Sequence, residues 1–214
     1  MDPVATPSDD AAGPAERWPL CGEEDLRQAL LAAWGAPERG YHDLLHLHEV
    51  LERLDEIALA GVPFDRVAVG LAAWFHDAVY DGAPGDEERS AAWAAEALPP
   101  LVGEAMAAEV ARLVRLTERH RPADGDVAGA ALCDADLAIL AAPPERYAAY
   151  VTAVRRDFAH VPDDAFARPV ALPVAVKDDP AIPLTVPLAG LVAARCGHES
   201  HHPSQLERLV ERSS

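Results

Sequence analysis

The stretch DRVAVGLAAWFHDAV, residues 65–79, decides the fold, because its residues are apolar on nearly every side. A helix of this composition belongs at the centre of a soluble bundle rather than on its surface. The pattern predicts a central helix over 65–79 with His76 and Asp77 in its final turns. These two side chains point about 100° apart around such a helix, so both can bind one ion.

Helical patterns flank this segment on both sides. Apolar residues recur there at helical spacing, and Pro or Gly separates each pattern from the next. The further predicted helices cover residues 23–34, 42–60, 87–98, 103–119, 127–141 and 144–159. No segment up to residue 160 alternates polar and apolar residues with a period of two. The sequence therefore predicts an all-α bundle.

The composition changes at both ends of the chain. Residues 1–17 are rich in Pro, Asp and Ala, which predicts a disordered lead. Residues 18–161 contain the helical patterns and form the predicted domain. Residues 162–214 contain prolines too densely for long helices, so we expect an irregular C-terminal segment there.

The formal net charge of −18 excludes some classes of partner. So acidic a protein repels nucleic-acid backbones and anionic membrane surfaces, whereas a bound metal still attracts a small phosphorylated substrate at short range. The three cysteines form no CxxC motif, and the first residues lack the pattern of a secretory signal. We expect a cytoplasmic protein, and the sequence specifies no oligomeric state.

Four ionisable residues lie among apolar neighbours: His46, His76, Asp77 and Asp136. Each alone has an ordinary interpretation, because a single histidine or aspartate is often a hydrogen-bonded core or boundary residue. Together, on separate apolar helix faces, they favour a shared partner. A divalent metal ion bound by all four compensates the cost of burying them.

Five motifs, in order along the chain, resemble the HD superfamily of metal-dependent phosphohydrolases. They are HLHEV (46–50), WFHDAVYD (74–81), DEERSA (86–91), TERH (117–120) and CDADLAIL (133–140). With YHDLLH (41–46), and with Tyr147 and Tyr150 in a YxxY pattern, the chain is similar to a bacterial subgroup of predicted HD-superfamily hydrolases. The resemblance covers residues 20–160. The Pro-rich segment after it departs from the subgroup, which continues there with further helices.

The resemblance implies an HD-domain helical bundle that holds a metal with His46, His76, Asp77 and Asp136. Of the two acids in the DADL motif, Asp136 is chosen over Asp134, since the superfamily's ligand is like the second acid. Two imidazoles and two carboxylates suit Mn, Fe, Co, Ni or Zn better than Mg.

The same resemblance suggests roles for neighbouring residues. Asp77 is expected to orient a water as well as to bind the ion. Glu88 or Glu87 is the candidate to accept the proton of that water, although acids are also favoured at the start of any helix.

His120 is expected either to bind a second metal or to face phosphate, in a cationic group with Arg119 and Arg121. A solvated helix end explains that group equally well. His42 and Tyr80 are expected to support the ligands and shape the pocket.

The expected function is hydrolysis of a small phosphate ester, of which a nucleotide is one example, by a metal-activated water. One alternative is a di-iron oxygenase of the same fold, which needs His120 and a further histidine at a second metal. Another is a non-catalytic module for nucleotide binding or protein interaction.

Overall fold

The computed structural model describes residues 13–159, and these form eight α-helices and two 3₁₀-helices with no strand. The all-α prediction is confirmed. In chain order the elements are η1 (Pro14–Arg17), α1 (Glu24–Trp34), α2 (Leu44–Leu59), α3 (Arg66–Phe75), α4 (Asp86–Ala97), α5 (Pro99–Val102), α6 (Glu104–Leu116), α7 (Val127–Asp136), η2 (Leu137–Ala141) and α8 (Pro144–Asp157). The predicted segment 162–214 lies outside the described residues.

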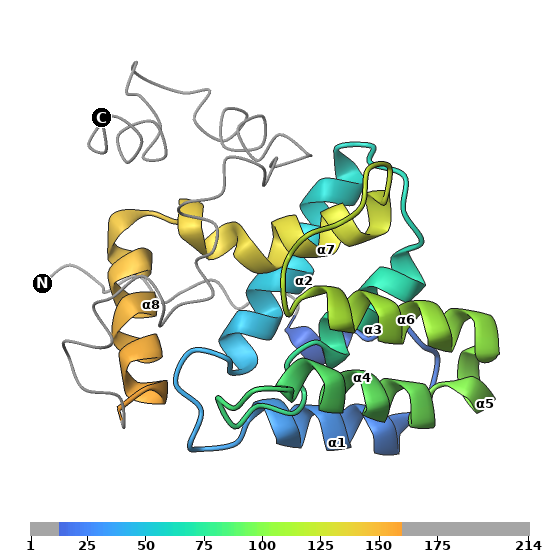
Figure 1. Cartoon of the computed structure of the whole chain (residues 1–214), viewed down its shortest axis with the longest axis horizontal. Helices are drawn as coiled ribbons and strands as arrows, with labels where there is room; N and C mark the ends of the chain where they lie inside the picture. Colours follow the sequence, from blue (N-terminus) through green and yellow to red (C-terminus); the bar gives the residue numbers. More distant parts are fainter. Residues whose placement is uncertain (1–12, 160–214) are drawn as a thin grey trace, which may run out of the picture.

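Helix α3 lies at the centre of the bundle and contacts α2, α4, α6 and α7. Figure 1 shows α4 and α6 side by side, and α8 at the edge of the molecule beside the end of η2. Every residue from Ala68 to Phe75 is buried, as its apolar composition predicts. Trp34 of α1 packs here too, and its indole N–H donates to the carbonyl of Trp74 at 2.9 Å.

Helix α3 ends at Phe75, four residues earlier than predicted, so His76 and Asp77 do not lie in its final turns. His76 is the C-cap, and the chain then turns away. The buried Arg39 stabilises this turn, because its guanidinium donates to the carbonyls of Asp77 at 2.8 Å and Ala78 at 2.9 Å. The early end of α3 presents both ionisable side chains on a turn.

Other helix boundaries also have local causes. Asp43 is the N-cap of α2, since its carboxylate accepts from the amides of Leu45 and His46. The predicted helix over 127–141 divides into α7 and η2 at Asp136. The sequence predicted disorder over residues 1–17, but Pro14–Arg17 forms the 3₁₀-helix η1, and Arg17 forms an ion pair with Asp55 at 3.1 Å.

Helix α8 is tied to the loop before α2. The Asp157 carboxylate accepts hydrogen bonds from the backbone amides of Gly40 and Tyr41. A Cβ at residue 40 would collide with the carbonyl of Ala153 and with this carboxylate, so only glycine fits. The loop that carries Tyr41 is therefore held against the last turn of α8.

No single helix among residues 13–159 is long and apolar enough to cross a membrane. The segments Val127–Ala141 and Pro144–Asp157, which meet at a bend of 103°, together have the length and composition of a membrane span, and only those two properties favour one.

Candidate metal centre

Three buried side chains from distant parts of the chain meet inside the bundle: His46 of α2, and His76 and Asp77 after α3. One donor atom from each lies within 4.8 Å of the other two. The two imidazole Nε2 atoms are 3.3 Å apart, and the Asp77 carboxylate lies 3.2 Å from His76 and 3.9 Å from His46. This group can hold a metal ion.

Asp136, at the end of α7, reaches the same point. One of its carboxylate oxygens lies 3.1 Å from His46 Nε2 and 3.6 Å from His76 Nε2. The other accepts a hydrogen bond from His120 Nε2 at 2.7 Å. The structure thus brings together all four residues predicted as ligands and places His120 directly behind one of them.

The orientation of His76 suits a metal ligand. Its Nδ1 lies 2.8 Å from the carbonyl of Ala73, and that carbonyl can only accept, so Nδ1 carries the proton. In the neutral ring, Nε2 then has a free electron pair directed at the cluster. A hydrogen bond of this kind from the distal ring nitrogen is usual in metal-bound histidines.

The donor distances also fit an ion. Two donors that each lie about 2.1 Å from one ion are roughly 3.0 to 3.4 Å apart in octahedral or tetrahedral geometry. The contacts between the imidazoles and their nearest carboxylate oxygens, at 3.1 and 3.2 Å, match this spacing. The His46, His76 and Asp77 group can therefore hold a transition metal, and Asp136 lies beside it, 3.1 Å from His46.

The two carboxylates of the cluster stabilise a positive charge between them. Burial raises the pKa of the Asp136 carboxyl, yet His76, His120 and His46 outweigh burial and hold that pKa well below its usual range. Burial lowers the pKa of His46, and the Asp136 carboxylate offsets this only in part. Burial also lowers the pKa of His76, but Asp77 and Asp136 raise it well above its usual value. The two carboxylates thus stabilise a cation between them, either a proton on His76 or a metal ion.

A cavity of about 250 Å³ opens beside this cluster, and we call it the cluster cavity. Its lining includes Asp77, Asp136 and His120 of the cluster. Five aromatic rings also line it: Tyr41, His42, Tyr80, Tyr150 and Phe158. Three further carboxylates complete its acidic part: Asp86, Glu87 and Glu118.

His42 and Tyr80 form part of the cavity wall, where their rings stack at 4.1 Å. His42 lies between two carboxylates, 4.0 Å from Asp77 and 3.6 Å from Asp157. His42 therefore lies beside Asp77, and Tyr80 lies beside His42.

Glu88, one of the two predicted proton acceptors, does not line the cluster cavity. Its exposed carboxylate forms an ion pair with Arg115 at 2.6 Å. Its neighbour Glu87, the other candidate proton acceptor, faces the cavity instead. Arg119 and Arg121 flank His120 in the chain, but neither is among the residues that line the cavity.

Two structural residues escaped the sequence analysis, Arg39 and Asp157. Both act through backbone groups of residues distant in the chain, Arg39 on the turn after α3 and Asp157 on the loop before α2. A helical pattern carries no signal for such contacts. The adjacent Gly40, which precedes YHDLLH, is the one local sign of a close approach.

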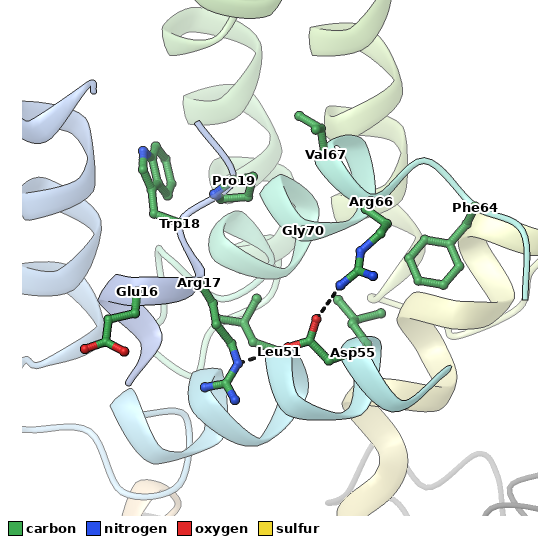
Figure 2. Close-up of a pocket in the computed structure, with 11 residues that line it drawn as sticks. Glu16, Arg17, Trp18, Pro19, Leu51, Asp55, Phe64, Arg66, Val67 and Gly70 are labelled. Carbon is green, nitrogen blue, oxygen red and sulfur yellow. Dashed lines mark hydrogen bonds and ion pairs between the residues drawn. The ribbon is translucent and has the colours of Figure 1, made fainter. Parts of the chain in front are cut away.

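A second cavity, of about 350 Å³, lies beside η1, between α2 and α3. Figure 2 shows its charged residues: Asp55 lies between Arg17 and Arg66, and Gly70 and Pro19 form part of the wall. We call it the η1 cavity. It is larger than the cluster cavity, but no residue that binds or supports the candidate metal lines it.

In comparisons with known proteins, the chain matches no family model, no curated protein and no solved structure. The resemblance to the HD superfamily therefore rests on the motifs, and the buried His46, His76 and Asp77 group is compatible with an HD-type metal site.

Proposed function

We propose that this protein is a metal-dependent phosphohydrolase that acts on a small phosphate ester. The observation that carries the proposal is the convergence of two buried imidazoles and two carboxylates at the end of a cavity. The proposed ligands are His46, His76, Asp77 and Asp136. When bound, a divalent transition metal would lower the pKa of a water and polarise a phosphoryl oxygen.

In this proposal the protein itself positions the reactants. The carbonyl of Ala73 fixes the ring of His76, and the Asp136 carboxylate is held by His120. Asp77 lines the cavity, where in this proposal it orients an incoming water through a hydrogen bond. His42 and the stacked Tyr80 close one side and limit the access of bulk water.

The test is metal content and turnover measured together. The purified protein is loaded with Mn²⁺, Co²⁺ or Zn²⁺ and assayed against a panel of phosphomonoesters. We expect the wild type to bind about one ion per chain and to release phosphate, and His46→Ala and His76→Ala to lose both properties. His48→Ala is the matched control, because His48 lies on the same helix but outside the cluster.

A wild type that binds no ion, or a His46→Ala variant that behaves like His48→Ala, contradicts the proposal. Metal analysis also separates the alternatives. Two irons per chain favour the oxygenase, and tight nucleotide binding without turnover favours the non-catalytic module.

A further inference from the structure

Among residues 13–159, two residues other than glycine have a left-handed backbone: Glu23, with a φ of 57°, and His120, with a φ of 50°. This region favours glycine, because a Cβ there lies too close to the following carbonyl oxygen. Glu23 is the exposed N-cap of α1, and its side chain makes no capping hydrogen bond. The side chain of His120 is only 12% exposed and lines the cluster cavity. At His120, therefore, an unfavourable backbone coincides with the candidate site.

The left-handed conformation of His120 arises where α6 ends. Beyond Leu116 the helix tightens, and the amides of residues 117–119 bond to carbonyls three residues earlier. The amide of His120 then donates to the carbonyl of Leu116 at 2.9 Å. A single bond of this kind from a left-handed residue closes many helices, and glycine, or sometimes asparagine, occupies that position. The backbone alone thus favours glycine at residue 120, so the histidine has another cause.

That cause lies in the side chain of His120. Its Nε2 lies 2.7 Å from one carboxylate oxygen of Asp136, and because a carboxylate only accepts, Nε2 carries the proton. The other oxygen of Asp136 lies 3.1 Å from Nε2 of His46 and 3.6 Å from Nε2 of His76. The hydrogen bond from His120 thus holds one oxygen and leaves the other directed at the two imidazoles.

Asp136 depends on this bond because its other contacts are with the cluster itself. It is the last residue of α7, where the α-helix changes to the 3₁₀-helix η2. His76 is fixed by the carbonyl of Ala73, and the backbone of Asp77 is held by Arg39. Among residues 13–159, the only hydrogen bond to the Asp136 carboxylate from outside the four proposed ligands comes from His120. The orientation of that carboxylate therefore rests on one donor.

We propose that His120 is a positioning residue, kept at a backbone position suited to glycine because its Nε2 proton directs the Asp136 carboxylate at the metal. The cost of the left-handed backbone is offset by a hydrogen bond to a charged group. This inference rests on the proposed metal site and is independent of the hydrolysis. It assigns the Nε2 of His120 to Asp136 rather than to a second ion or to phosphate.

The test separates the backbone of residue 120 from its side chain. In His120→Gln the amide nitrogen takes the place of Nε2, so the donor is kept on a backbone that glutamine does not favour. His120→Asn tolerates the left-handed region, but its amide nitrogen corresponds to Nδ1 and is too short to reach Asp136. His120→Gly suits the backbone best and has no donor.

The affinity for Mn²⁺ is measured by titration calorimetry on protein first treated with EDTA. We expect a Kd within about threefold of the wild type for His120→Gln. His120→Asn and His120→Gly should bind about 10- to 100-fold more weakly, the usual effect of removing a group that orients a metal ligand. Glu23→Asn is the matched control, because it makes the same change at a left-handed residue outside the cluster, and it should keep the wild-type affinity.

Weak binding by the asparagine and glycine variants, with glutamine close to the wild type, supports the inference. It does so even if no phosphate ester is hydrolysed, a result that overturns only the proposed hydrolysis. Wild-type affinity in His120→Asn and His120→Gly overturns the inference and leaves residue 120 a backbone role alone. Equal weakening by glutamine and asparagine, or loss of one of two bound ions, overturns it by identifying His120 as a ligand. A wild type that binds no Mn²⁺ overturns both the inference and the metal site. If His120→Gln does not fold, His120→Gly and the count of bound ions still decide.

Discussion

Residues of α2 line the η1 cavity, and Tyr41 and His42, just before α2, line the cluster cavity, yet the charged groups of the two cavities are paired differently. In the η1 cavity, Asp55 pairs with Arg17 at 3.1 Å and with Arg66 at 2.6 Å, and its side chain is 41% exposed. In the cluster cavity, Asp136 is only 12% exposed and has histidines as its partners. Asp55 thus has two arginine partners, whereas Asp136 has none among residues 13–159.

The pairing of charged groups, rather than volume, distinguishes the two cavities. Exposed ion pairs contribute little to stability and place no demand on a ligand. Buried carboxylates carry a desolvation cost, which a cation beside them offsets, here either a proton on His76 or a metal ion. We therefore locate the site by its unbalanced buried charge, and each prediction below tests whether that imbalance distinguishes the two cavities.

The largest effect is expected on adding metal. An ion present at 100 times its dissociation constant stabilises the folded protein by about 2.7 kcal/mol. For a domain of this size that corresponds to a rise in Tm of roughly 5 to 10 °C. Differential scanning calorimetry with and without Mn²⁺ or Zn²⁺ measures it. Asp136→Asn should lose most of the rise and Asp55→Asn should retain it, and equal rises in both variants would remove the distinction between the cavities.

Metal binding should strengthen as the pH rises. Although burial opposes it, Asp77 and Asp136 raise the pKa of His76, so the metal-free protein holds a proton there at neutral pH. That proton favours folding below the ordinary pKa of 6.5, and the contribution is lost as the pH rises through the raised pKa. Each proton displaced by the ion changes affinity by about tenfold per pH unit. Calorimetry in two buffers of different ionisation enthalpy counts the protons released, and a count of zero would contradict this.

A change at Asp157 should lower stability without removing the metal. In Asp157→Asn, an amide nitrogen replaces one of the two carboxylate oxygens. That nitrogen cannot accept a hydrogen bond, so one of the two bonds from the backbone amides of Gly40 and Tyr41 is lost. The expected loss is about 1 to 3 kcal/mol in the free energy of unfolding, measured with urea. The number of ions bound should be unchanged. Loss of the ion would show that α8 organises the cluster itself rather than the wall beside it.

The smallest effect is expected in the η1 cavity. Asp55→Asn weakens two ion pairs at a partly exposed carboxylate, so the free energy of unfolding should fall by less than about 1 kcal/mol. Metal content and phosphate release should equal those of the wild type. A loss of turnover in this variant would mean that the η1 cavity takes part in function.

Local patterns were sufficient for much of the fold. The apolar segment at 65–79 predicted a central helix, and Ala68 to Phe75 are indeed buried. The meeting of His46, His76 and Asp77 was also expected, since isolated ionisable residues on apolar faces must find partners inside the bundle. The end of α3 was predicted incorrectly, because no pattern near residue 76 reveals that Arg39 binds the carbonyls beyond it.

The sequence by itself determined that this chain forms a helical bundle with charged groups turned inward, because helical periodicity and the cost of burying charge act over a few residues. Only the tertiary structure decided which acids share a cavity. Glu87 and Glu88 are adjacent and chemically alike, yet one faces the cluster cavity and the other pairs with Arg115. That choice depends on how α4 packs against α6, and packing joins residues far apart in the chain.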